Sequence, residues 1–243
     1  MTMEADRQRE ALTKQVISQL EQKVGAKRAT MAARYFEQCF RSVPTDEMEA
    51  ESPATWATII VRQLGFIASR QPGETLIRIF NPGLDDEGWE SPHTIVELVN
   101  DDKPFLVDTD SLTLYEMGLG LHLIIHPVIR VGRDEDGQLK SIHPKKTRRG
   151  KPESIIQFQV DRRTAPAELK EIRRRLEAAL DDARLAVRDW RAMEARVEDA
   201  RDSLTDWAGS VNDDWLRECQ AFLDWLMADN FIFLGVRDYR VYR

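Results

Sequence analysis

Two histidines form the first group whose type and spacing could do chemistry. His122 and His126 are four residues apart in a predicted strand, so they share one face, with Arg130 beyond them. A zinc site would need a third protein ligand at a useful spacing, and none follows. We therefore interpret both histidines as surface or partly buried residues, and we predict no metal ligand in this sequence.

Two acidic groups are the next candidates. The run 134–136 (DED) lacks the twelve-residue ligand spacing of a calcium loop, which favours a solvated turn. Asp101, Asp102 and Asp108 could act as paired acid and base carboxylates. Because no nucleophile or electrophile accompanies them, they are better interpreted as a turn followed by a helix start.

A basic cluster comes later in the chain: Lys145, Lys146, Arg148, Arg149 and Lys151. A flexible, solvated loop is the favoured interpretation. Docking onto an acidic surface or a phosphate is the alternative, because clustered cations attract anions over several ångströms.

The sequence lacks the short motifs that identify common active sites. There is no GxGxxG after a strand, no GxxxxGK[ST], no GxSxG, no HExxH and no CxxC. We therefore assign no catalytic and no cofactor-binding residue. The absence of these motifs favours a sensor or an assembly unit over an enzyme.

Composition excludes several classes of partner. The 243 residues are 42% hydrophobic and 32% charged, which is typical of a globular protein with one large domain or two smaller ones. A net charge of -7 argues against nucleic acid as a partner. No apolar run approaches the ~20 residues of a membrane span, and residues 1–10 lack the apolar core of a signal peptide. With Cys39 and Cys219 interpreted as buried free thiols, we expect a cytoplasmic protein with no membrane partner.

The stretch around residues 93–131 must position these candidates. A strand at 93–99, an acidic turn, a short helix and a strand at 121–131 form the first half of a βαββαβ unit. We expect Asp102 to cap the helix, Pro104 to lie in its first turn and Gly118 to end it. Pro127 cannot donate to a strand ladder, so we expect it at a sheet edge or a bulge.

The flanking patterns complete an α+β prediction: an N-terminal helical layer, an antiparallel ferredoxin-like βαββαβ sheet packed with helices, and a long C-terminal helix. Helices are expected at about 4–24, 28–41, 53–70, 164–207 and 212–228, and further strands at 75–80, 154–160, 231–236 and 239–242. The segments 42–51, 81–92 and 143–152 are expected to be connections, and 133–137 a hairpin tip. The last helix is expected to bury Trp215, Leu216, Cys219, Phe222, Leu223 and Leu226.

We predict three segments along the chain. Residues 1–72 form the helical segment, and 73–208 form the α+β domain with its long helix. Residues 209–243 provide a linker helix and the first strand of a following, truncated domain. A chain that stops at Arg243 in a strand pattern is expected to be a fragment.

Several runs together resemble the N-terminal region of the large bacterial NAD-specific glutamate dehydrogenases. They are SPHTIVE (91–97), DDKPFLVDT (101–109), GLGLHLIIHPV (118–128), FLDWL (222–226) and DNFIFLG (229–235). The resemblance extends from about residue 12 to the end of the chain. It implies that the Rossmann-type domain, which oxidises L-glutamate to 2-oxoglutarate and ammonia with NAD, lies far downstream. Neither a catalytic residue nor the NAD site of the full-length enzyme is then carried by this chain.

The corresponding region of that family is similar to ACT domains. These βαββαβ domains pair sheet to sheet or helix to helix, and many bind an amino acid at the first βα turn and a subunit interface. The resemblance places that effector or interface turn at Asn100, Asp101, Asp102, Lys103, Pro104, Phe105 and Leu106. Ligand-binding turns usually have glycine directly after the proline. Phe105 stands there in this sequence, which favours self-packing over an amino-acid pocket.

The resemblance therefore implies a non-catalytic regulatory and oligomerisation module of an NAD-dependent glutamate dehydrogenase. Its partners would be other domains and subunits of the same homo-oligomeric enzyme. The alternative is an allosteric sensor domain that binds an amino-acid effector through the first βα turn. A small enzyme of unrecognised type is the third hypothesis, and the missing polar constellation disfavours it.

Overall fold

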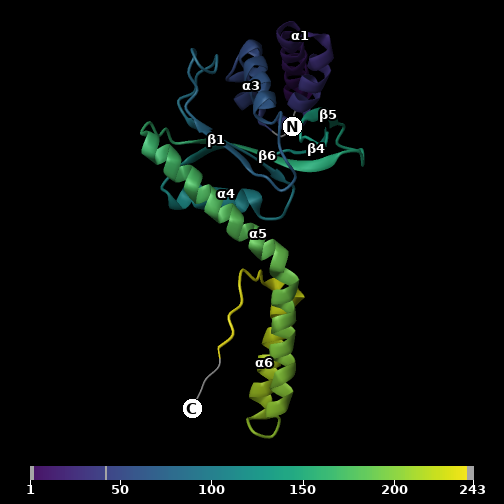
Figure 1. The fold of residues 1–243 in the computed structure, drawn as a ribbon, viewed down its shortest axis with the longest axis vertical. Helices are drawn as coiled ribbons and strands as arrows, with labels where there is room; N and C mark the ends of the chain where they lie inside the picture. Colours follow the sequence, from purple (N-terminus) through teal and green to yellow (C-terminus); the bar gives the residue numbers. More distant parts are fainter. Residues whose placement is uncertain (1–2, 42, 240–243) are drawn as a thin grey trace. The chain divides into compact units, whose positions relative to one another are not determined.

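The computed structural model describes residues 3–41 and 43–239 (Figure 1). The chain forms two compact units, Met1–Leu176 and Glu177–Arg243, and each is described by itself. The predicted borders near residues 72 and 208 stay a prediction.

The first unit begins with three helices, α1 (Met3–Cys39), α2 (Thr45–Glu49) and α3 (Pro53–Phe66). The backbone of Gly25 leaves the helical region at φ 72° and ψ 158°, so α1 consists of two helical stretches. The sequence predicts this division because glycine is tolerated there without a Cβ clash. The short α2 lies where we expected an unstructured connection, and Ser42 falls outside the described residues.

Helix α3 begins as its sequence predicts. The Ser52 hydroxyl accepts a hydrogen bond from the Thr55 amide at 3.1 Å, and Pro53 occupies the first turn. Its buried face includes Trp56, Ile59 and Ile60. Helix α3 ends at Phe66, a few residues before the expected stop.

Six strands form one antiparallel sheet in the order β1-β2-β6-β4-β5, with β3 also paired to β6. The strands are β1 (Leu76–Phe80), β2 (Thr94–Asp101), β3 (Leu121–Ile125), β4 (Val128–Arg133), β5 (Leu139–His143) and β6 (Lys151–Val160). The antiparallel layer and the α+β fold class are as predicted.

The predicted continuous strand 121–131 is wrong, because the chain breaks at His126 and Pro127 into β3 and β4. Both strands pair with β6, and the Ile155 amide donates to the Pro127 carbonyl at 3.1 Å between them. Proline has no amide hydrogen for the ladder, so the strand is interrupted at this position. Ile125, Ile129 and Val131 nevertheless face the same side, as expected.

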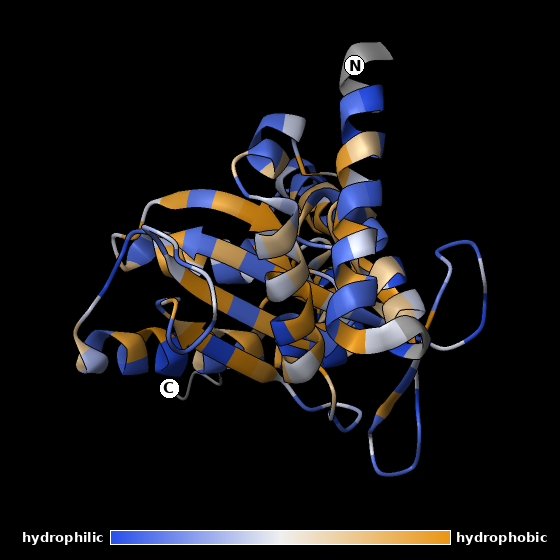
Figure 2. Ribbon diagram, turned by 90° about the horizontal axis from the view of Figure 1, so that it is seen from above, coloured by the Kyte–Doolittle hydropathy of each residue, from blue (hydrophilic) through white to orange (hydrophobic). Residues whose placement is uncertain are grey.

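Helices cover both faces of this sheet. Helices α1 and α3 lie on one face, while α4 (Leu106–Glu116) and the first turns of α5 (Pro166–Ser203) lie on the other (Figure 1). Strand β2 is therefore buried over its first seven residues. Hydrophobic and hydrophilic residues form bands along the strands (Figure 2). Alternate residues such as Ile95 and Val99 join the core under α1 and α3.

The strand order differs from βαββαβ in one respect. In that motif the last strand pairs beside the first, whereas here β1 pairs with β2 from Leu76–Val99 to Phe80–Ile95. No strand follows α5 in the described part of the chain. The edge beside β2 is thus taken by a strand that precedes it in sequence.

The second unit contains the rest of α5, then η1 (Leu204–Trp207), α6 (Asp213–Trp225) and η2 (Leu226–Asn230). The Asn212 side chain caps α6 by accepting the Asp214 and Trp215 amides at 2.8 and 3.1 Å. Gly209 takes a left-handed φ of 78° just after η1, where the sequence predicts the end of the long helix.

The predicted burial of α6 is wrong for most of its apolar residues. Leu216 alone is buried within this helix, while Trp215 and Phe222 are 60% and 58% exposed. Cys219 is half-buried, whereas Cys39 is buried. An antiparallel helix pair has a single interface, so each helix can bury only one stripe.

The strand predicted at 231–236 is also absent. Residues 231–239 have no regular structure, because the described part of the second unit contains no strand with which they could pair. Most of the strand predicted at 239–242 lies outside the described residues. No described helix combines the length and the apolar character that crossing a membrane requires.

Candidate functional site at the first βα turn

The predicted effector or interface turn connects β2 to α4. Asn100 and Asp101 are the last two residues of β2, and Leu106 is the first residue of α4. Asn100 and Leu106 are buried, and Asn100 accepts a hydrogen bond from the Thr75 hydroxyl. Asp102, Lys103 and Pro104 are exposed in the turn itself.

The start of α4 differs from the prediction. Phe105 occupies the N-cap position, and no side chain caps the helix, so the cap expected from Asp102 is wrong. Pro104 lies outside the first helical turn, because the left-handed Phe105 precedes the helix and α4 begins at Leu106. The Asp102 amide instead contacts the Pro152 carbonyl of β6 at 3.4 Å. At the other end, Gly118 has a φ of 69°, as expected of a helix stop.

Phe105 has a backbone conformation that glycine normally provides. Its φ of 68° and ψ of 3° lie in the left-handed region, which costs a residue with a Cβ about 1–2 kcal/mol. This is the position where ligand-binding ACT turns usually have glycine. At this position the chain has a left-handed backbone together with a phenyl ring, which is 39% exposed.

Asp101 is fixed by a buried arginine. Its carboxylate accepts hydrogen bonds from the Arg70 guanidinium at 2.5 Å and from the Gly73 amide at 3.0 Å. Partial burial alone would raise the pKa of Asp101, but the hydrogen bond and charge of Arg70 outweigh it and lower that pKa below its ordinary value. Asp101 is therefore a fixed anion rather than a free acid or base.

Arg70 belongs to a larger network, which we call the arginine–carboxylate network: Arg70, Asp101, Arg133 and Glu153. Arg70 and Glu153 are 2% and 3% exposed and are joined at 2.8 Å. Arg133 binds both carboxylate oxygens of Glu153, at 2.8 and 2.9 Å. Two guanidinium groups and two carboxylates thus balance in charge, which burial of ions requires.

Backbone carbonyls accept further hydrogen bonds from both arginines. Arg70 also donates to the Glu74 carbonyl at 2.9 Å, and Arg133 donates to the Gly137 and Ile67 carbonyls at 2.9 and 3.0 Å. A pocket of about 200 Å³ borders the network. Because both arginines donate to protein acceptors, they are poorly placed to receive the carboxylate of a bound amino acid.

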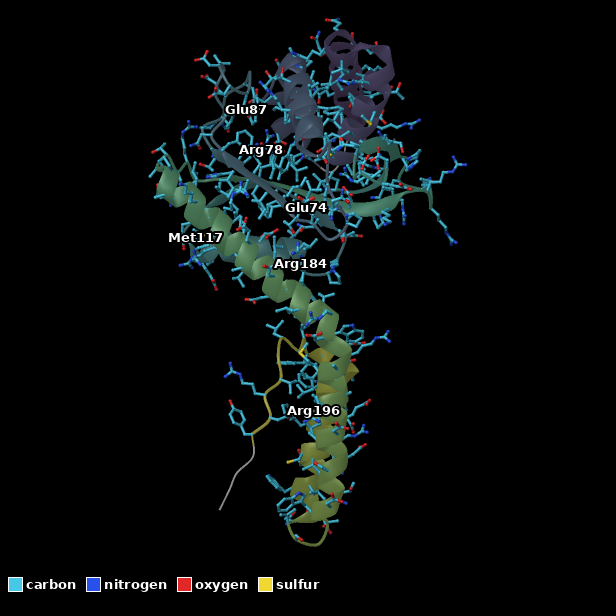
Figure 3. The ribbon with its side chains drawn as sticks, viewed as in Figure 1. Glu74, Arg78, Glu87, Met117, Arg184 and Arg196 are labelled. Carbon is cyan, nitrogen blue, oxygen red and sulfur yellow. The ribbon has the colours of Figure 1, made fainter. Side chains whose placement is uncertain are left out.

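A second buried polar cluster lies between α3 and the sheet. Glu97 accepts hydrogen bonds from Gln63 at 3.1 Å and from Arg78 at 2.8 Å, and Gln63 also donates to Gln157. Burial raises the pKa of Glu97, and the charge of Arg78 offsets part of that rise. Arg78 also reaches Glu87 of the following loop, at 3.6 Å (Figure 3). None of these residues lines the pocket at the turn.

His122 and His126 are both exposed, as predicted, and they have different partners. His122 stacks on His93, with ring centroids 4.1 Å apart, and contacts Asp161 at 2.8 Å. His126 lies in the break after β3 and contacts the Ser154 hydroxyl. Sequence spacing missed His93, since β6 brings the start of β2 and β3 together. No three His, Cys, Asp or Glu residues in the described parts of the chain are arranged to hold a metal ion.

The acidic run 134–136 forms the hairpin tip that the sequence predicts. Asp134 accepts the Gln138 amide at 2.8 Å and pairs with Lys140 at 2.7 Å. The tip closes against the segment between α3 and β1, because the Gly137 carbonyl accepts the Arg70 amide at 3.1 Å. A Cβ on Gly137 would lie 2.6 Å from the Arg70 carbonyl oxygen, so only glycine fits there.

Comparisons with known proteins agree with this geometry. A family model described as "Glutamate dehydrogenase, ACT1 domain" matches residues 35–176. The NAD-specific glutamate dehydrogenase of Halomonas elongata is 31% identical over 233 residues, which are 95% of this chain and 14% of that protein. The Pseudomonas aeruginosa enzyme of the same name is 30% identical over 230 residues, with 93% and 14% covered.

The chain thus spans 14% of the length of these two relatives. The matched region contains the whole six-stranded sheet, the arginine–carboxylate network and the turn at residues 100–106. The match covers more than half of the 243 residues. This chain belongs to the family of glutamate dehydrogenase ACT1 domains.

Proposed function

We propose that this chain is a non-catalytic regulatory and oligomerisation module of an NAD-dependent glutamate dehydrogenase. The full-length enzyme would convert L-glutamate and NAD to 2-oxoglutarate, ammonia and NADH in the cytoplasm. The free cysteines Cys39 and Cys219 suit such a reducing compartment. The partners of the module would be other domains and subunits of the same enzyme.

The arginine–carboxylate network is the observation that supports this proposal most directly. Its charges compensate one another, and its arginines donate to protein atoms beside the turn at residues 100–106. A corner fixed in this way gives the turn a rigid shape, which suits a contact surface better than an adaptable pocket.

The neighbouring surface of α4 also suits a protein contact. Leu112 and Tyr115 are 59% and 74% exposed, and the Phe105 ring lies at the start of the same helix. Exposed apolar side chains grouped on one element are typical of interaction sites.

Two measurements on the 243-residue chain test the proposal. We expect no glutamate-dependent reduction of NAD, and we expect sedimentation velocity to give a mass above that of a monomer. Dehydrogenase activity of this chain would contradict the non-catalytic part, and a monomer at every accessible concentration would contradict the assembly part.

An amino-acid sensor is the alternative, and the left-handed backbone of Phe105 is the observation that favours it. Calorimetry against a panel of amino acids separates the two functions. We expect no binding by the wild-type chain, whereas micromolar binding would favour the sensor. Binding gained by Phe105→Gly, and not by Phe105→Ala, would indicate that the ring blocks a turn of ligand-binding geometry.

A further inference from the structure

A broad groove lies on the first unit, away from the first βα turn. Its volume is about 900 Å³, and its walls come from the second stretch of α1, the break between β3 and β4, and the loop after β5. Four cations line it: Arg34, Arg41, Lys145 and Lys146. We call this the basic groove.

Two hydrogen bonds join the walls of the basic groove. Arg34 donates to the Ile142 carbonyl at 3.3 Å, and Gln38 donates to the His143 carbonyl at 3.1 Å. These contacts tie α1 to the end of β5, from which the loop with Lys145 and Lys146 departs. The cations of the helix and of the loop are therefore held on the same side of the molecule.

Among the residues that line the groove, positive charge exceeds negative charge. Glu37 is the single carboxylate among the lining residues. In the described parts of the chain, none of the four cations forms an ion pair with a carboxylate. Exposed cations that lack counter-charges attract an acidic partner and orient it before contact.

The second unit supplies negative charge. Residues 177–243 contain fifteen acidic residues, nine arginines and no lysine, so nearly all of the net charge of -7 resides there. The acidic tip is the part of this unit between the two helices, with Asp206 in η1 and Asp213 at the start of α6. Trp207 and Trp215 lie beside them and are exposed.

We propose that the basic groove binds the acidic tip of a second copy of this chain. The carboxylates of Asp206 and Asp213 would face Lys145 and Lys146, and the exposed tryptophans would cover Pro127 and Val128, which also line the groove. This inference rests on the proposed assembly function and assigns it a surface.

We assign the acidic tip to a second copy because the proposed function is assembly. The test below distinguishes this contact from a tip that fills the groove of its own chain.

A small anion suits the groove less well than an acidic protein surface. The four cations are exposed, so water and salt screen each contact over about 8 Å at physiological ionic strength. Several weak contacts spread over a broad surface add up, while a small ligand reaches only one or two of them.

Charge reversal on each side tests the proposal by sedimentation equilibrium at low and high salt. We expect the groove variant Lys145→Glu/Lys146→Glu and the tip variant Asp206→Lys/Asp213→Lys each to raise the dimer dissociation constant about tenfold or more. A chain that carries all four changes should regain association, because a negative groove then meets a positive tip.

Arg148→Glu/Arg149→Glu provides the matched control, since these arginines belong to the same loop without lining the groove. Association unchanged in this control supports the proposal, and an equal loss would overturn it in favour of general charge attraction. If the groove variant still self-associates, the groove is not the contact surface, although the proposed assembly function would still hold. A monomeric wild-type chain would overturn both, and it is the result expected if each tip filled its own groove.

Discussion

At Phe105, substitutions can test the effect of the left-handed backbone separately from that of the phenyl ring. A left-handed φ favours glycine, so Phe105→Gly relieves strain that Phe105→Ala retains. We expect the glycine variant to be more stable than the alanine variant by about 1 kcal/mol. Urea unfolding of both variants measures the difference, and an equal or larger stability of the alanine variant would contradict the conformation assigned to this residue.

Asp110 is the most unusual carboxyl group of the fold. It is fully buried in α4, and neither of its oxygens has a hydrogen-bond partner among the described residues. Burial raises its pKa from 3.8 to about 8. The folded chain therefore holds the proton that the unfolded chain releases above about pH 4.

Stability should depend on pH accordingly. The contribution of Asp110 is fully present below pH 4 and is lost as the pH rises towards about 8. We expect Asp110→Asn to match the wild type near pH 4 and to exceed it at pH 8, as urea unfolding across this range would measure. Asp108→Asn, at an exposed position of the same helix, is the control for an Asp-to-Asn change that does not touch a buried carboxyl group.

Glu153 compensates two arginines, so its removal should be costly. Glu153→Gln leaves buried guanidinium charge without its carboxylate, and we expect a loss of about 3 kcal/mol in the free energy of unfolding. The exposed pair of Lys140 and Asp134 is the comparison, and Lys140→Met should cost less than about 1 kcal/mol. Equal losses in the two variants would mean that the network does not stabilise the corner of the sheet.

Helix α6 exposes an apolar stripe that its sequence pattern predicts to be buried. Phe222→Ser should change the free energy of unfolding of the second unit by less than about 0.5 kcal/mol, since the ring is 58% exposed. Leu216→Ala on the buried stripe should cost about 2–4 kcal/mol. Circular dichroism during urea unfolding distinguishes these outcomes, and a costly Phe222→Ser would mean that this face is covered in solution.

Local signals account for the elements that the sequence predicts correctly. Gly25 divides α1, Ser52 caps α3, and Gly118 ends α4, because each acts on its own backbone within a few residues. The α+β class follows in the same way from short-range periodicity.

The errors arise where distant parts of the chain decide the outcome. Pairing with β6 determines where the 121–131 segment breaks, and the described part of the second unit contains no partner strand for 231–239. The arginine–carboxylate network was missed for the same reason. Arg70, Arg133 and Glu153 come from three separate segments, and their side chains meet only after the sheet has formed.

Across the whole chain, charge is divided unevenly between the two units. The first unit is nearly neutral and has a basic groove, whereas the second is acidic and helical. This asymmetry makes heterologous contact between copies electrostatically favourable, and added salt should weaken it.

The position of β1 at the sheet edge affects the order in which the molecule can form. Because the strand that completes the edge beside β2 is synthesised early, all six strands have left the ribosome once Val160 has emerged. The helical hairpin beyond Leu176 is not needed to complete any ladder. A chain that ends at Leu176 should therefore fold cooperatively by itself, and during synthesis the native sheet can form before the acidic second unit is translated.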